Sequence, residues 1–231
     1  MIGKFILEVG VESAGAAAAA ERGGADRIEL CADLHVGGLT PSREIMREAR
    51  SAVRLPIHAM IRPGAGNFVY SDEEFAQMKA SMVLARDLKM DGIVLGILQG
   101  NKTVDVSRTI ELIDLASPMQ ATFHRAFDQC SDLSIMLEAV VKTGAKRILT
   151  SGGARNALEG AGKLHLLVKS AKNRIVIMPG GGINPENVGR LLTVTGATEL
   201  HSGLGSVFPY GTEDDSGFEA GVRRMKEASP D

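Results

Sequence analysis

The chain has 231 residues, of which 44% are hydrophobic and 23% are charged. This composition suits one large domain with a sizeable core and excludes a disordered chain. Lys and Arg total 26 against 28 Asp and Glu, a net charge of −2 with no block of one sign, so neither a nucleic-acid nor an anionic-membrane partner is expected.

Short β-rich runs alternate with stretches of helical period along the whole chain. The runs predict strands at 5–11, 27–32, 57–62, 92–98, 120–127, 147–151, 175–180 and 199–202. The stretches predict helices at about 13–23, 42–53, 72–89, 105–116, 132–143, 156–171, 185–194 and 216–228. This alternation indicates parallel pairing through crossovers, and the length favours closure. The sequence therefore predicts an α/β fold, a single-domain TIM (β/α)8 barrel over residues 1–231.

Capping signals mark several helix starts. The segment 71–74, Ser-Asp-Glu-Glu, has the spacing of a capping box. Thr40-Pro41 and Asn184-Pro185 each place an N-cap residue before a proline at the first helical position. Helices are therefore expected to begin directly after Ser71, Thr40 and Asn184.

The chain shows no sequence feature of a secreted or membrane protein. No stretch of about 18 apolar residues is present, so no transmembrane helix is expected. The first residues run straight into a strand pattern without the apolar region of a signal peptide. Cys31 and Cys130 form no CxxC motif, and two reduced thiols in a cytoplasmic protein are the simplest interpretation.

Polar residues stand near the C-terminal ends of the predicted strands, although parallel barrel strands are usually apolar on both faces. Because side chains alternate along a strand, Arg27, Glu29 and Cys31 share one side, as do Glu199 and His201. These side chains then converge at one mouth, where TIM-barrel enzymes place their chemistry. The candidate catalytic residues are Glu8, Glu29, Arg62, His124, Arg125 and His201.

Two interpretations of this polar set stay open. Buried charges must be paired or functional, so a structural ion-pair network is one of them. The other is a ligand site, which the position of the set favours. In such a site the acid or base would be His124 or His201, the second carboxylate Glu8 or Glu29, and the anion holders Arg62 and Arg125. Glu29, Arg62 and His124 are expected to form one hydrogen-bonded cluster that is costly to break.

Glycine-rich turns follow the last three predicted strands. Glycine lets backbone N–H groups face an anion, and TIM barrels often bind phosphate after strands seven and eight. Glycine is also the ordinary residue of tight turns, which stays the alternative. The candidate anion-binding residues are Ser151, Gly152, Gly153, Gly180, Gly181, Gly182 and Ser202.

Eight segments together resemble the CutC-type copper homeostasis family, and they span residues 7 to about 203. The resemblance implies a cytoplasmic TIM barrel that is associated with copper handling and binds copper through cysteines. It implies no known reaction, since a barrel supports many chemistries. The segments are ADRIELC (25–31), GGLTPS (37–42), HAMIRP (58–63), NFVYSDEE (67–74), TFHRAFD (122–128), RILTSGG (147–153), IVIMPGGGI (175–183) and ATELHS (197–202).

One departure from the family pattern bears on copper. The first strand of the family commonly reads LEVC, whereas this chain has Gly10 at the cysteine position. The second family cysteine matches Cys31, which is the remaining candidate metal ligand. Cu(I) prefers soft thiolate or thioether ligands, so a single thiol predicts weak Cu(I) binding.

Functions of different classes follow from these observations. The resemblance predicts a copper-binding or copper-handling homeostasis protein whose ligand and cofactor is copper. The polar mouth predicts, as the alternative, an enzyme acting on a small anionic metabolite that is phosphorylated or sugar-like. A non-catalytic binding barrel is the third class. The residues name no substrate and no oligomeric state, and a homodimer stays open.

Overall fold

The barrel predicted from the sequence is confirmed. The computed structural model describes residues 5–204 and 215–228, in which eight strands pair in parallel in the order β7-β6-β5-β4-β3-β2-β1-β8. A bridge between Gly180 and His201 joins β7 to β8 and closes the barrel. The strands are β1 (Ile6–Val11), β2 (Arg27–Leu30), β3 (Ile57–Met60), β4 (Gly92–Leu95), β5 (Gln120–Phe123), β6 (Arg147–Thr150), β7 (Val176–Pro179) and β8 (Glu199–Ser202).

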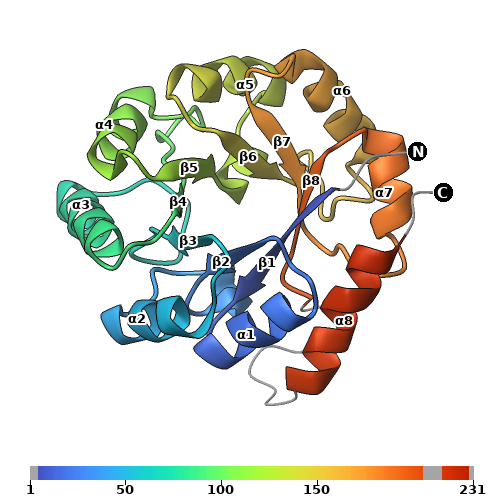
Figure 1. Cartoon of the computed structure of the whole chain (residues 1–231). Coiled ribbons are helices and arrows are strands. Elements are labelled where there is room, and N and C mark those ends of the chain that lie inside the picture. Colours follow the sequence, from blue (N-terminus) through green and yellow to red (C-terminus); the bar gives the residue numbers. More distant parts are fainter. Residues whose placement is uncertain (1–4, 205–214, 229–231) are drawn as a thin grey trace.

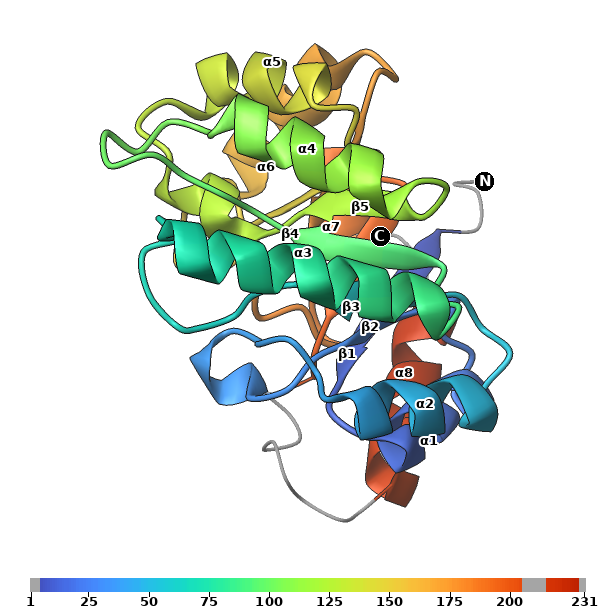
Figure 2. The ribbon, with the colours of Figure 1, turned by 90° about the vertical axis from the view of Figure 1, so that its left-hand side faces the viewer.

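Eight α-helices within the described ranges form a ring outside the strands (Figure 1). Seen from the side, α3 and α4 run along the outside of β4 and β5 (Figure 2). The helices are α1 (Ala14–Arg22), α2 (Arg43–Ala52), α3 (Asp72–Asp87), α4 (Val106–Ala116), α5 (Leu133–Lys142), α6 (Ala161–Ala171), α7 (Val188–Thr195) and α8 (Asp215–Glu227). None of these helices is both long and apolar enough to span a membrane.

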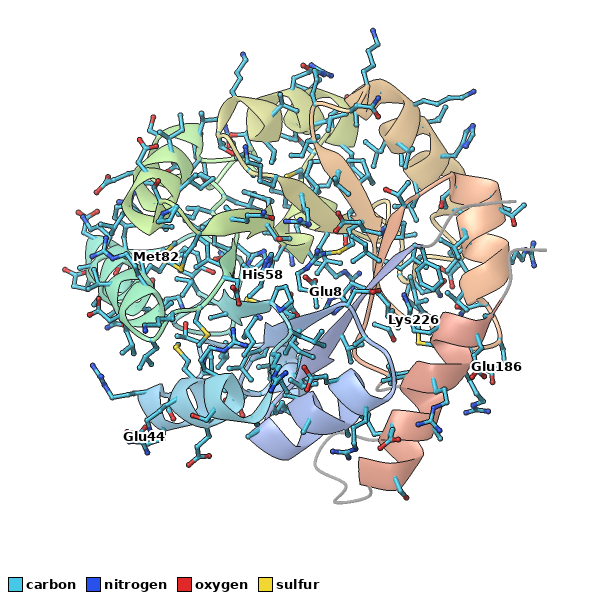
Figure 3. All side chains as sticks on the ribbon, in the orientation of Figure 1. Glu8, Glu44, His58, Met82, Glu186 and Lys226 are labelled. Carbon is cyan, nitrogen blue, oxygen red and sulfur yellow. The ribbon has the colours of Figure 1, made fainter. Side chains whose placement is uncertain are left out.

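The strand alternation separates an apolar layer from a polar interior. In β2, Ile28 and Leu30 are fully buried within the apolar core. Figure 3 places Met82 of α3 on the side of the helix that faces the barrel and Glu44 of α2 on the outside. Glu8 and His58 instead lie toward the centre of the barrel (Figure 3). The core therefore sits between strands and helices, and the polar side chains are left inside the barrel.

The predicted start of α3 is confirmed, because Ser71 and Glu74 form the capping box. Two other predicted starts are wrong. Ser42, and not Thr40, caps α2, since its side chain accepts from the Ile45 N–H. The helix expected after Asn184 begins at Val188, because the 184–187 segment forms a turn held by side-chain bonds of Asn187.

Two further boundaries differ from the sequence prediction. The strand expected over 120–127 ends at Phe123, and Arg125–Gln129 forms a 3-10 helix. The helix expected from 156 begins at Ala161. Gly160 lies so close to the end of β6 that an added Cβ would be 1.8 Å from the Ser151 carbonyl oxygen. This close approach fixes the turn that precedes the helix.

Candidate functional site

A layer of ion pairs fills the N-terminal half of the barrel. The Arg27 guanidinium donates to Glu8 at 2.5 Å and to Glu199 at 2.6 Å. Arg147 donates to Glu199 at 2.7 Å and to the Gln120 side chain at 2.8 Å. Four of these residues are the first of their strands, and Glu8 is the third residue of β1. Their side chains therefore close the N-terminal end of the barrel. The structural ion-pair network considered from the sequence is therefore present in this half.

A chain of polar contacts leads from this layer toward the mouth. Glu8 uses Oε2 for Arg27 and Oε1 for His201, whose Nδ1 lies at 2.9 Å. The other His201 nitrogen, Nε2, lies 3.6 Å from Glu29 Oε2. The Cys31 thiol donates to the same Glu29 oxygen at 3.5 Å. All five side chains are at least nine-tenths buried or close to it, so protein groups set their charges.

The pKa values along this chain follow from burial and neighbouring charges. Burial alone would raise the pKa of Glu8, but Arg27 and His201 hold it well below its ordinary value. Burial opposes protonation of His201, yet Glu29 and Glu8 raise its pKa. Burial raises the pKa of Glu29, and burial with the Glu29 charge raises that of Cys31. The thiol is therefore protonated at neutral pH, while Glu8 is a carboxylate.

Three of these side chains could hold a metal ion. Glu8, Glu29 and His201 each offer a ligand atom, and these atoms lie within 4.8 Å of one another. Glu29 Oε1 is buried and has no hydrogen-bond partner within the described residues. The sequence placed these three residues at one mouth as acid, base and carboxylate candidates, and the structure brings them together.

Gly10 borders the same cluster. A Cβ at this position would lie 3.4 Å from the His201 ring and 3.6 Å from Glu29 Oε2. The family's additional cysteine would therefore stand beside Glu29 and His201. In this chain Cys31 is the one thiol at this place, and Cys130, which donates weakly to the Ala126 carbonyl at 3.8 Å, belongs to the 3-10 turn after β5.

Above the cluster, a cavity of about 610 Å³ opens at the C-terminal ends of the strands. Glu29 and His201 line it, and so do Arg62 and His124 from the ends of β3 and β5. No hydrogen bond joins Glu29, Arg62 and His124 to one another among the described residues. The expectation that these three side chains form one hydrogen-bonded cluster is therefore wrong, because Arg62 is turned toward carbonyl groups of the Val36–Gly38 loop.

His124 depends on a glycine of the neighbouring strand end. A Cβ on Gly96 would lie 2.4 Å from His124 Nδ1 and 3.0 Å from the Ala126 Cβ. A Cβ contact of 2.4 Å does not occur in real structures, so the imidazole occupies space that only glycine leaves free. No sequence pattern indicates this pairing, since Gly96 follows β4 and His124 follows β5, 28 residues later in the chain.

We expect Gly96→Ala to lower the free energy of unfolding by about 1–3 kcal/mol, because overpacking forces neighbours to shift. Urea denaturation measures the change. Gly162→Ala is the matched control: Gly162 is the second residue of α6 and has open space around its Cβ position, so alanine there should change the stability by less than about 0.5 kcal/mol. Equal stability of Gly96→Ala and the unaltered protein would contradict this packing.

The candidate anion-binding turns divide into two groups. The backbone N–H groups of Ser151 and Gly153 donate to the Asp128 carboxylate, each at 3.0 Å. Arg125 donates to Asp128 at 2.8 Å and to the Ser151 hydroxyl at 2.9 Å. The anion at the turn after β6 is thus a side chain of the protein. Asp128 was missed as a site residue, although its spacing of three from Arg125 is a signal for such a pair.

The turns after β7 and β8 remain open to the cavity. Gly181, Gly182 and Ser202 line it, whereas Gly180 pairs with His201 in the barrel and Gly152 donates to the Thr150 hydroxyl. The loop after Ser202 is described only as far as Leu204, so the rest of the glycine-rich segment lies outside the described residues. Anion binding at these turns stays a prediction.

Known proteins are similar to this chain over most of its length. The Homo sapiens copper homeostasis protein cutC homolog is 45% identical over 197 residues, which cover 85% of this chain and 72% of that protein. The family protein CutC of Agrobacterium fabrum is 46% identical over 234 residues, covering 96% of this chain and 93% of that protein.

Solved structures show the same architecture. The crystal structure of CutC from Streptococcus agalactiae has a TM-score of 0.82 and 33% identity, covering 86% of this chain and 98% of that one. A thiamine phosphate pyrophosphorylase from Pyrococcus furiosus, with a TM-score of 0.64 and 17% identity over 97% of this chain and 96% of that chain, shares the fold alone. The model of the CutC family matches residues 5–206. This chain therefore belongs to the CutC family.

Proposed function

We propose that this chain is a cytoplasmic copper-handling protein and that copper, its cargo, binds at the floor of the cavity. The observation that carries the proposal is the buried group of Glu8, Glu29 and His201 with ligand atoms within 4.8 Å of one another. The names of the Homo sapiens and Mus musculus relatives as copper homeostasis proteins support copper as the cargo. The alternative, an enzyme acting on an anionic metabolite, is not favoured, because the names of these relatives state no reaction.

The donor set suits one oxidation state of copper better than the other. Imidazole and carboxylate ligands are typical of Cu(II), whereas Cu(I) selects thiolates and thioethers. Cys31 supplies one thiol beside Glu29, and its raised pKa keeps it protonated. The cluster is therefore expected to bind Cu(II) through His201 and the two carboxylates.

We expect His201→Asn to weaken Cu(II) binding by more than about tenfold, since even changes to groups that only support a metal ligand cost about 10–100-fold. Titration against a competing chelator measures the affinity. His165→Asn on α6, outside the cavity lining, is the matched control and should leave the affinity unchanged. Cu(II) binding that survives His201→Asn intact would contradict the proposed site.

A further inference from the structure

A second part of the cavity wall takes no part in the proposed copper site. Arg62 is 5% exposed, yet no carboxylate lies within ion-pair distance of it in residues 5–204 and 215–228. The equally buried Arg27 has two such partners, Glu8 and Glu199. A buried charge without a counter-charge is costly. Arg62 therefore leaves a positive charge at the cavity that the described residues do not neutralise.

The hydrogen bonds of the Arg62 side chain orient its guanidinium and leave other N–H donors available. Nη1 donates to the carbonyls of Val36 and Gly38, each at 3.0 Å. Nε is buried and has no hydrogen-bond partner among the described residues. The guanidinium also lies beside the Tyr70 hydroxyl, whose pKa burial raises to about 12 against the opposing charge of Arg62. An arginine held in this way presents its remaining donors in a fixed geometry.

His124 adds a neutral donor to the same wall. Its Nδ1 accepts from the Ala126 N–H at 3.2 Å, so the neutral ring carries its proton on Nε2. Burial and the Arg62 charge lower the pKa of His124 to about 3, which keeps the ring neutral. Nε2 is buried, and no described residue forms a hydrogen bond with it. Its N–H is therefore an unsatisfied donor beside a cationic side chain.

Phe68 contacts both side chains. Its ring centroid lies 4.8 Å from Arg62 Cζ and 5.0 Å from the centroid of the His124 ring. Its backbone has a φ of 64°, a left-handed conformation that is costly for an aromatic residue. The Leu98 N–H holds the Phe68 carbonyl at 2.8 Å. The fold thus accepts local strain to keep an aromatic ring against the two donors.

We propose that Arg62 and His124 bind the oxyanion group, a carboxylate or a phosphate, of a small organic anion in the cavity. One uncompensated positive charge and unsatisfied N–H donors match an oxyanion, because charge-assisted hydrogen bonds are the strong ones. The volume of about 610 Å³ has room for a small metabolite. This site goes beyond the copper function, since Glu8, Glu29 and His201 do not form it.

Metal-free protein, prepared with a chelator, tests the proposal by thermal shift and calorimetry. The probes are inorganic phosphate, glycerol 3-phosphate and glycerate, with neutral glycerol as the control. We expect at least one charged probe to raise Tm and glycerol to have no effect. Binding of glycerate alone assigns a carboxylate, and binding of the phosphates alone assigns a phosphate.

Two variants separate this site from the glycine-rich turns. His124→Asn keeps an acceptor for the Ala126 N–H and removes the Nε2 donor, while Arg62→Lys keeps the charge and loses the fixed donors. Each variant should lower the affinity for the probe by about tenfold or more. His165→Asn should change this affinity by less than about twofold. Unchanged affinity in both variants, or no Tm rise with any charged probe, overturns the proposal. Neither result depends on copper.

Discussion

Replacing Glu8 with alanine is expected to lower the free energy of unfolding by about 3–5 kcal/mol, the usual cost of breaking a buried ion pair. The substitution removes the 2.5 Å contact with Arg27 and the 2.9 Å contact with His201. Arg27 keeps Glu199 as a partner, but His201 loses one of the two carboxylates that raise its pKa. Urea denaturation at neutral pH measures the difference.

The matched control for this prediction is Glu111→Ala. Glu111 pairs with Lys79 at 3.0 Å on the surface, where an ion pair contributes about 0–1 kcal/mol. A Glu8→Ala effect as small as that of the control would contradict a structural role for Glu8.

Acid should reduce the contribution of Glu8. Its folded-state pKa lies below the ordinary value of 4.5, so its ionisation stabilises the fold fully only above that value. The contribution is lost as pH falls from 4.5 toward the lowered pKa of the folded state. The stability difference between the unaltered protein and Glu8→Ala is therefore expected to shrink over this range.

A single substitution at Gly10 should increase the affinity of the protein for Cu(I). We expect the unaltered protein to bind Cu(I) weakly and Gly10→Cys to bind it at least about tenfold more tightly, a gain of about 1.4 kcal/mol. A Cβ at position 10 lies 3.6 Å from Glu29 Oε2, the atom to which Cys31 donates at 3.5 Å. A second thiol then joins the first, as Cu(I) prefers. Competition with a Cu(I) chelator measures both affinities.

The role of Cys31 provides the control for the copper experiment. Cys31→Ser should leave the weak Cu(I) binding of the unaltered protein unchanged and should abolish the gain in the Gly10→Cys background. Tight one-to-one binding by the unaltered protein, lost on Cys31→Ser, would show that one thiol with its neighbours suffices.

Features that follow from strand period could be predicted from the sequence. The side-chain alternation of β1, β2 and β8 placed Glu8, Glu29 and His201 inside the barrel, because a period of two leaves no freedom once one face is buried. The eight-strand order followed from the regular alternation with helices. The copper family was identified from motifs spread over the same strands and their loops.

Features that depend on contacts between distant residues could not be predicted. Arg27 was placed inside the barrel, but its partner Glu199 lies 172 residues away in sequence. The 3-10 turn that carries Asp128 looked like the continuation of a strand, so an open anion site was expected where Asp128 already accepts from Ser151. No local pattern showed that Gly96 makes room for His124.

The ion pairs among Arg27, Glu199 and Arg147 close the N-terminal end of the barrel, so the cavity opens at one end only. A molecule bound beside Glu29 therefore has to enter and leave through the same opening, since paired charged side chains fill the other end of the barrel. Changes at the entrance should then alter the rates of arrival and departure together and leave the equilibrium unchanged. Changes at Arg62 or His124 should instead alter residence time, the quantity through which contacts usually set affinity.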